Sequence, residues 1–473
     1  MMKNGSKYEA FLSSLQEEKS KPTDEALIQR MWFEEVFASP LKTVEGEEIV
    51  IKQPGFWNYG AGPDFLRAVI CNGKGEIEVG DIEIHLSAKR WLEHGHESDQ
   101  AYEKVILHAV WETGPKEFFT GSLKRKFIRL VELKSQLREG LCLSEIEDAF
   151  TSDSEERNVG IKYGKCKREL SLLTDEQIKN LLLEAGWYRF EKKVRLWSLR
   201  KRIFGYSQAL WVGLADALGY AGSKENRSAF VGLVRKSSSC GISQLLKEKS
   251  AVKREALLFG LAGFLPTKSI KLGDSSGNHW LRELWEEWWK MRVGLESETL
   301  AKSRWNLRGI RPANRPERRL AVLALLSDKK QWRSFEKRCK AASSKEIESF
   351  LGDLDHPFWS WHYTMQSKRT SKQISLLASG RVRPYLYNVV WPLVYRSNKN
   401  LVSKELEEAK STLTNHPSQV AAVRLLGDRA KKIRGLKSSL LVQEGLLQIY
   451  RDFCLTDTDR CESCQFSTWV KSL

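Results

Sequence analysis

The stretch from Gly62 to Trp111 combines strand-forming patterns with clustered ionisable side chains, and it constrains the fold more than any other part of the chain. Apolar and polar residues alternate over 65–71 and 76–86, a period typical of half-buried strands. This alternation places Glu83 and His85 on one face of the second strand. Four of the eight histidines lie in the same stretch. A sheet surface needs no such density of acids and histidines, so the stretch predicts a functional site.

The elements around these strands predict a mixed α/β N-terminal domain. Apolar residues recur at helical spacing over 25–37, with Thr23 or Asp24 as the N-cap. Short strands are expected at 49–51 and 105–111, and a short helix at 88–94. A one-residue slip in the alternation near Gly80 indicates a bulge. The predicted element order is α-β-β-β-α-β.

Asp64 and Glu83, expected on neighbouring strands, form a candidate metal site. Carboxylate oxygens are the ligands that Mg²⁺ prefers, and Mn²⁺ accepts them as well. Such a metal lowers the pKa of a bound water and stabilises charge on an attacked phosphate. A neutral imidazole at His85 can accept the proton of that water. A purely structural interpretation competes, in which Asp64 belongs to a turn and His85 is a half-buried sheet residue.

A second metal hypothesis uses His94, His96, Asp99 and His108. Two histidines and a carboxylate can bind Zn²⁺ or a non-haem iron, which would suit a small-molecule metallohydrolase. Loop hydrogen bonds explain such residues more often than metal binding does, and His108 fits a core histidine on an apolar strand.

Composition indicates a globular protein with a polyanionic partner. The chain has 473 residues, enough for two or three domains, and 41% of them are hydrophobic. No apolar run approaches the ~20 residues of a membrane helix. The polar segment 1–20 lacks the apolar core of a secretory signal, so a cytoplasmic location is expected. Lysine and arginine outnumber the acids 77 to 60, which gives a net charge of +17.

The basic excess is clustered and interleaved with aromatic residues, which favours nucleic acid over a membrane as the partner. The clusters are Lys124–Arg129, Arg189–Arg202 and Arg304–Arg319. The residues expected to contact nucleic acid are Arg200, Lys201, Arg202, Arg311 and Arg315. The alternative is that these runs are ordinary solvated faces.

The sequence predicts three regions. Residues 1–135 form the mixed domain, residues 136–165 form an acidic, serine-rich linker, and residues 166–473 form a mainly helical basic region. Helical spacing is found at Asp175 to Phe204, Gln208 to Leu218, Arg227 to Val234, His279 to Met291, Arg318 to Leu326 and Leu440 to Phe453.

The C-terminal tail predicts a second metal site. Cys454, Cys461 and Cys464 fall within eleven residues of a chain that has only eight cysteines. Their spacing resembles the first three ligands of the iron–sulfur loop in helix-hairpin-helix DNA glycosylases, but Val470 stands where the fourth would lie. Cys166, in a basic context, is the predicted fourth ligand. A [4Fe–4S] cluster and Zn²⁺ fit this set equally, and unligated surface thiols are the alternative.

Pro63-Asp64 and Glu83-Ile84-His85, in their expected element order, resemble the PD-(D/E)XK nuclease superfamily. The resemblance covers about the first quarter of the chain and implies a restriction-endonuclease-like fold and metal-dependent cleavage of DNA or RNA. His85 stands here in place of the lysine of that family's motif. The alternative is that Lys89 performs the function of that lysine. The other hypothesis is a non-catalytic protein that retains the nuclease fold and binds nucleic acid without cleaving it. Related nucleases sometimes join one upstream cysteine to three C-terminal ones around a [4Fe–4S] cluster.

The whole chain is also similar to an uncharacterised bacterial family, domain of unknown function 2851. The matching stretches are Gly62–Phe65, Ile82–His85, Val105–His108, Gly309–Asn314 and the Cys461–Cys464 tail. This similarity implies no established activity, but it favours treating the three regions as one functional unit.

Overall fold

The computed structural model describes residues 7–15, 24–114, 128–150, 164–219, 223–239, 250–266, 275–295, 299–377, 379–410, 416–431, 439–455, 461 and 464–473. The chain divides into two compact units. The sheet unit comprises Lys21–Ile146 and Arg200–Val389, and the cysteine unit comprises Met1–Ser20, Glu147–Leu199 and Val390–Leu473. The predicted boundaries at 135 and 165 stay a prediction.

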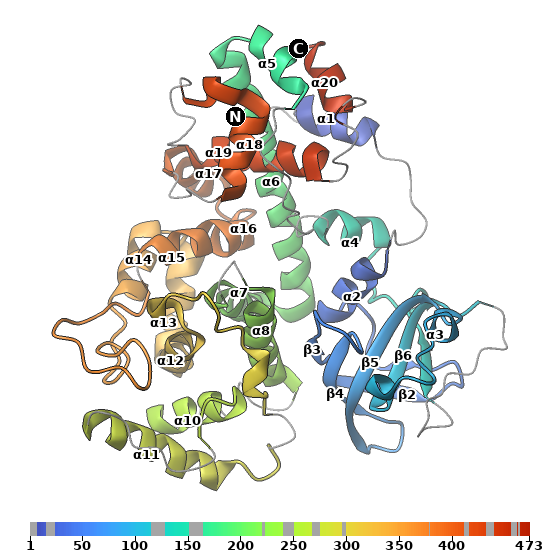
Figure 1. The fold of residues 1–473 in the computed structure, drawn as a ribbon, viewed down its shortest axis with the longest axis vertical. Helices are drawn as coiled ribbons and strands as arrows, with labels where there is room; N and C mark the ends of the chain where they lie inside the picture. Colours follow the sequence, from blue (N-terminus) through green and yellow to red (C-terminus); the bar gives the residue numbers. More distant parts are fainter. Residues whose placement is uncertain are drawn as a thin grey trace. The chain divides into compact units, whose positions relative to one another are not determined.

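The sheet unit contains a mixed seven-stranded sheet, with strand order β1-β2-β4-β5-β6-β7 and β3 paired to β4 (Figure 1). Strands β1, β2, β4 and β5 pair antiparallel, whereas β5, β6 and β7 run parallel. The strands are β1 (Leu41–Lys42), β2 (Glu48–Gln53), β3 (Phe56–Trp57), β4 (Phe65–Cys71), β5 (Ile77–Ser87), β6 (Val105–Glu112) and β7 (Arg129–Glu132).

Two short helices frame the sheet and bring side chains to it. Helix α2 (Glu25–Phe33) begins where the Asp24 carboxylate accepts the backbone N–H of Leu27, and it packs against β5. Helix α3 (Arg90–Glu93) and the 3₁₀ turn η1 (Gln100–Tyr102) lie in the crossover from β5 to the parallel strand β6. A parallel pair requires such a crossover, and it carries His94 and His96 past the end of β5.

The irregularity predicted near Gly80 is present, but the extra residues lie in the partner strands. The register shifts on β4 between Phe65 and Ala68, and again where β5 pairs with β6. Arg67 takes a φ of 58° at the first shift, and its N–H donates to the Asp81 carboxylate at 2.9 Å. A Cβ at Gly80 would lie 2.7 Å from the Lys104 carbonyl oxygen, so the close approach of the neighbouring strand requires glycine.

The other regular elements of the sheet unit are helices and helical turns. The helices with residues in this unit are α4 (Leu143–Phe150), α6 (Asp175–Phe204), α7 (Tyr206–Leu218), α8 (Lys224–Ser239), α10 (Ala251–Leu261), α11 (Ser275–Met291), η4 (Lys302–Arg304), η5 (Pro312–Asn314), α12 (Pro316–Leu326), α13 (Lys329–Ala341), α14 (Ser344–Gly352), α15 (Ser379–Tyr385) and η6 (Leu386–Val390). The mixed α+β class is therefore confirmed, and α6 has the predicted bounds. Helix α4 lies inside the predicted linker, because Ile146 and Ala149 supply a buried helical face that the acidic composition hid.

The cysteine unit is helical in its described residues. It contains α1 (Lys7–Ser14), α5 (Cys166–Leu172), α6 up to Leu199, α16 (Trp391–Val394), α17 (Lys399–Glu408), α18 (His416–Leu426), η7 (Gly427–Lys431), α19 (Leu440–Tyr450), the π-helical turn η8 (Arg451–Leu455) and α20 (Gln465–Val470). Among all the helices that the structure describes, none is long and apolar enough to cross a bilayer.

A buried charge cluster inside the sheet unit corrects one prediction. Arg200, expected to contact nucleic acid, is 6% exposed, and its guanidinium donates to both carboxylate oxygens of Glu34. Arg30 and Arg235 also pair with Glu34. Arg200 is thus not available to an external partner. The local run of basic residues could not reveal that Glu34, far away in sequence, neutralises it.

We expect Glu34→Gln to destabilise the sheet unit by about 3–5 kcal/mol, because it leaves three guanidinium groups facing one another without their counter-ion. Burial alone would raise the pKa of Glu34, but Arg200, Arg30 and Arg235 together hold it well below its ordinary value. The carboxylate therefore contributes its full stability above the pKa of Glu34 in the unfolded chain. This stability is lost as the pH falls from that value through the lower pKa of Glu34 in the folded protein. Urea unfolding checks this, with the exposed Glu93→Gln as control. Equal midpoints for both variants would contradict it.

Candidate metal and catalytic site

Asp64 and Glu83 lie next to each other at the junction of β4 and β5. The backbone N–H of Asp64 donates to Glu83 Oε2 at 3.0 Å, and that of Ile84 donates to Asp64 Oδ2 at 2.9 Å. The Gln29 amide of α2 donates to Asp64 Oδ1 at 2.7 Å. These bonds fix both carboxylates and leave Glu83 Oε1 to face the histidines.

Glu83 Oε1 is equidistant from two imidazole nitrogens. His85 Nε2 and His96 Nε2 each lie 3.4 Å from it. Two donor atoms bound tetrahedrally at ~2.1 Å to one metal stand about 3.4 Å apart. The ligand atoms of His85, His94 and His96 also lie within 4.8 Å of one another. The donor set thus has the composition and spacing of a transition-metal site.

His108 supports His85 from the neighbouring strand. His85 Nδ1 and His108 Nε2 are 2.9 Å apart, so one ring donates to the other. When His85 Nδ1 is the donor, the lone pair of its Nε2 points to Glu83, the arrangement common in metal-bound histidines. His108 is completely buried on β6, in register with Glu83. The prediction of a core histidine at 108 describes its burial but missed this contact.

His96 has a polar atom that the protein leaves unsatisfied. Its Nε2 is buried and makes no hydrogen bond with any described residue. The ring stacks on Tyr102 with centroids 3.8 Å apart and meets the edge of Trp91. Because a buried polar atom without a partner is costly, its persistence beside Glu83 fits a ligand position. His94, by contrast, is exposed beside this buried set.

Burial determines the protonation of this site. Burial and the neighbouring Glu83 raise the pKa of Asp64 to about 8, and burial likewise raises the pKa of Glu83 to about 8. Burial, together with the surrounding histidines, lowers the pKa of His85 to about 2. Burial also lowers the pKa of His108 to about 3. His85 and His108 are therefore neutral, and a neutral imidazole is the form that binds metals, while the carboxyls hold protons that a cation would displace.

The lysine alternative is not supported by the geometry. The Lys89 side chain is 59% exposed and pairs with Glu93 at 3.1 Å, at the outer start of α3. Arg90 acts electrostatically on His85 and donates to Glu25 Oε1 at 2.8 Å. Glu25 also accepts the backbone N–H of Leu86. Arg90 and Glu25 thus border the site at the end of β5.

Of the remaining predicted nucleic-acid contacts, three lie on the surface and one is partly covered. Lys201 and Arg311 are exposed, and Arg202 pairs with Glu145 at 2.9 Å. Arg315 is partly buried and pairs with Glu317 at 3.1 Å. The predicted basic run Lys124–Lys126 lies outside the described residues.

Sequence reasoning placed Asp64, Glu83 and His85 together and treated His94, His96, Asp99 and His108 as a separate group. The structure brings the three histidines of that group to the first one, whereas Asp99 caps η1 by accepting the backbone N–H of Ala101. It also adds Glu25 and Gln29, which the sequence analysis missed. Their four-residue spacing on a predicted helix puts them on one face, and this was the available signal.

The four predicted cysteine ligands come together in the cysteine unit. Cys166 begins α5, Cys454 lies in the π-helical turn η8, and Cys464 is the N-cap of α20. Cys461 Sγ accepts the backbone N–H of Lys165 at 3.2 Å. Cys166 and Cys454 belong to one apolar cluster with Tyr8 and Phe466, and Cys464 packs against this cluster.

The thiols are close enough to influence one another electrostatically. Burial, with smaller contributions from Cys454, Cys464 and Cys461, raises the pKa of Cys166 to about 12. Burial raises the pKa of Cys454 to about 11, although Arg424 opposes the shift. The raised pKa values of Cys166 and Cys454 keep these two thiols protonated without a metal, and coordination would convert them to thiolates. Thiolates are ligands for Zn²⁺ and for iron–sulfur clusters, but among the described residues these sulfur atoms do not form a group of three within 4.8 Å of one another, as His85, His94 and His96 do.

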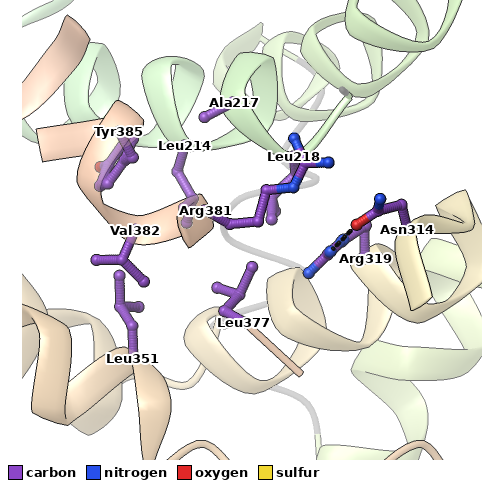
Figure 2. Close-up of a pocket in the computed structure, with 10 residues that line it drawn as sticks. All are labelled: Leu214, Ala217, Leu218, Asn314, Arg319, Leu351, Leu377, Arg381, Val382 and Tyr385. Carbon is purple, nitrogen blue, oxygen red and sulfur yellow. Dashed lines mark hydrogen bonds between the residues drawn. The ribbon is translucent and has the colours of Figure 1, made fainter. Parts of the chain in front are cut away.

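A small pocket in the sheet unit contains Arg319 and Arg381 among apolar side chains (Figure 2). Its volume of about 20 Å³ accommodates about one water molecule. Arg319 donates to Asn314 Oδ1 at 2.8 Å and to the Leu376 carbonyl, and burial lowers its pKa to about 9. The stretch Gly309–Asn314 therefore ends in Asn314, which positions the buried Arg319. The pocket around these two residues is too small for a substrate.

A family model described as a protein of unknown function, DUF2851, matches residues 25–419. Neither the curated proteins nor the solved structures contain a match to the chain. The matched range begins at the first residue of α2 and includes the whole carboxylate–histidine site. The chain belongs to the DUF2851 family.

Proposed function

We propose that this protein is a metal-dependent hydrolase that cleaves phosphodiester bonds of DNA or RNA at the site formed by Asp64, Glu83, His85 and His96. The observation that carries the proposal is the position of Glu83 Oε1, 3.4 Å from both imidazole nitrogens and beside a second carboxylate. The resemblance of Pro63-Asp64 and Glu83-Ile84-His85 to the PD-(D/E)XK motif, and the restriction-endonuclease-like fold it implies, remain part of this proposal.

The donor set suggests which metal the site holds. Imidazole nitrogens suit Zn²⁺, and carboxylate oxygens suit Mg²⁺ and Mn²⁺, so a mixed set of two imidazoles and two carboxylates favours Zn²⁺ or the transition metal Mn²⁺ over Mg²⁺, and Mn²⁺ is the candidate tested first. When bound, such a metal supplies an activated water and stabilises charge on the phosphate. The histidines and carboxylates, which the sequence suggested as two rival sites, act here as one.

The side chains divide the remaining work. Both nitrogens of His85 are engaged, Nδ1 with His108 and Nε2 toward Glu83, so His85 is a ligand rather than the base. His94 is exposed, with its ring 5.0 Å from that of His85, and can exchange a proton with solvent. Arg90, held by Glu25, supplies positive charge at the edge where a phosphate would approach.

The decisive experiment incubates the purified protein with single- and double-stranded DNA and RNA in the presence of Mn²⁺, Mg²⁺ or Zn²⁺. Cleavage that requires a divalent metal and stops with chelator is the expected result. Binding without cleavage under every metal would favour the non-catalytic nucleic-acid-binding alternative. Hydrolysis of small phosphoesters alone would favour the metallohydrolase alternative, which the mixed histidine–carboxylate set also fits.

Affinity for nucleic acid is expected to fall steeply with salt, because the net charge of +17 favours phosphate contacts. Each neutralised phosphate contributes roughly 0.7–0.9 to the log–log slope, so removing the exposed cations Lys201 and Arg311 should reduce the slope by roughly 1.4–1.8. Anisotropy titrations between low and moderate salt measure this, with Lys329 and Lys330 as the control pair. A flat salt response would remove nucleic acid as the partner.

Binding of Mn²⁺ is expected to strengthen as the pH rises toward about 8, where Asp64 and Glu83 lose their protons. A raised pKa means that the metal-free site holds protons at pH 7, which the cation must displace. Affinity should therefore rise about tenfold per pH unit for each proton released. Calorimetry in buffers of different ionisation enthalpy counts these protons. An affinity independent of pH between 6 and 8 would show that the carboxyls are not ligands.

For the cysteine unit, we propose a structural metal held by Cys166, Cys454, Cys461 and Cys464. The support is the effect of Cys454, Cys461 and Cys464 on the pKa of Cys166, together with the hydrogen bond from the backbone N–H of Lys165 to Cys461 Sγ, which joins segments far apart in sequence. Thiolate coordination would tie α5, η8 and α20 to one point. Zn²⁺ and a [4Fe–4S] cluster stay equal candidates.

A further inference from the structure

A second pocket of the sheet unit lies beside the loop that carries Asp64. Its volume is about 280 Å³, and it is formed by β3 and the following loop, the beginning of α8, and the segment 300–304. The residues that matter for its chemistry are Trp57, Asn58, Tyr59, Glu225, Ser228 and Arg304. Ligand pockets usually have volumes of about 300 Å³ or more. This pocket is at the lower end of that range and has room for one small chemical group.

One residue connects the pocket to the carboxylate site. The backbone N–H of Asn58 donates to the Asp64 carbonyl at 2.7 Å, and its side-chain amide donates to the Pro63 carbonyl at 3.0 Å. Trp57 is also the register partner of Phe65, the residue after Asp64. A group bound in the pocket is thus only a short distance along the backbone from the proposed catalytic carboxylate.

The pocket presents an aromatic surface. The rings of Trp57 and Tyr59 stack with centroids 5.4 Å apart and planes 21° apart. Phe65 and Phe33 support Trp57 from behind, at 5.5 and 5.4 Å. Tyr59 is nevertheless 44% exposed, which is unusual for a large ring in a stacked group. A supported, partly exposed ring pair is a platform for a planar ligand.

Polar atoms lie beside these rings. Ser228 is 6% exposed, and its Oγ is buried without a hydrogen-bond partner among the described residues. A buried hydroxyl left unpaired is costly, so it indicates a ligand atom that completes the site. Asn58 Oδ1 lies 3.4 Å from the Arg304 guanidinium, which adds positive charge to the pocket wall. A purely apolar ligand would leave Ser228 unsatisfied.

We propose that this pocket binds one unpaired nucleobase of the substrate strand, with its ring on Tyr59 and Trp57 and its polar edge on Ser228. This inference rests on the proposed function, because it places the base next to the phosphate that Asp64 and Glu83 would hold. The pocket admits a single unpaired base and not a base pair. The protein is therefore specific for single-stranded or locally unpaired nucleic acid.

The test compares a fluorescein-labelled oligothymidylate with an abasic oligonucleotide of the same length and charge, by anisotropy and in chelator so that no cleavage occurs. The wild-type protein should bind the base-bearing strand roughly tenfold more tightly, as one stacked base provides. Tyr59→Ala and Ser228→Ala should both reduce this ratio, Tyr59→Ala nearly to one. Tyr59→Phe should keep it, and so should Tyr363→Ala, which removes an exposed tyrosine elsewhere.

The outcomes separate this inference from the proposed function. A base preference that Tyr59→Ala abolishes supports the pocket even if no metal yields cleavage. Metal-dependent cleavage without a base preference overturns the pocket and leaves the hydrolase proposal standing. No binding of either strand, or a preference that survives in Tyr59→Ala, also overturns the pocket.

Discussion

Glu83→Gln and Asp64→Asn are each expected to lower metal-dependent cleavage about 10³-fold or more. Each amide keeps the shape of the side chain but removes the negative oxygen that would bind the metal, and with it several kcal/mol of transition-state stabilisation. Glu83→Gln should also lower the affinity for the metal more than Asp64→Asn does, because Glu83 Oε1 faces both His85 and His96. Single-turnover cleavage and Mn²⁺ titration of the purified variants measure the two effects.

These variants should remain folded, which makes the loss interpretable. Burial raises the pKa of both carboxyls, so the metal-free protein gains nothing from their charge and tolerates the amides. Exposed Glu93→Gln is the matched control and should retain full cleavage. If Glu83→Gln or Asp64→Asn cleaves like the wild type, with contaminating nuclease excluded, the site assignment is wrong.

Cys461→Ser should remove the metal of the cysteine unit and destabilise that unit strongly. Protein prepared without oxygen should contain either iron with labile sulfide or about one zinc per chain, and this content should fall in the variant. Because coordination couples α5, η8 and α20, the loss should lower the thermal midpoint of the cysteine unit. Metal analysis and calorimetry give the two readouts. Cys71→Ser, on β4 of the sheet unit, is the control.

Cys166→Ser tests the fourth ligand separately. It should lose metal as Cys461→Ser does, since Cys166 shares its electrostatic environment with the three C-terminal thiols. If only Cys166→Ser retains metal, another residue completes the set. Anaerobically prepared wild-type protein that is metal-free and fully stable would leave the four cysteines without a structural role.

Local patterns predicted the elements with long, regular periodicity. The helix from Asp175 to Phe204 and the strand from Phe65 to Cys71 have the predicted bounds. Strands β1 and β3 contain two residues each and have no period to detect, so their pairing depends on tertiary contacts. Strand β7 was missed as well, since its four residues alternate too briefly to distinguish a strand from a loop.

Only part of the candidate site could be predicted from the sequence, because local patterns do not show tertiary contacts. Alternation along one strand predicted that Glu83 and His85 share a face. The contacts of His96 and His108 cross from a loop and from a parallel strand, so no local spacing predicts them. Arg200 shows the opposite error, because its basic neighbours suggested a surface while Glu34 buries it.

The contact between His85 and His108 has an evolutionary consequence. A lysine at position 85 would remove the 2.9 Å contact between His85 Nδ1 and Nε2 of the completely buried His108, so a lysine there is expected to be tolerated only with a second change at position 108. Either change alone passes through a destabilised intermediate, and the two positions should therefore change together or not at all. Proteins that have both His85 and His108 are therefore expected to keep both histidines.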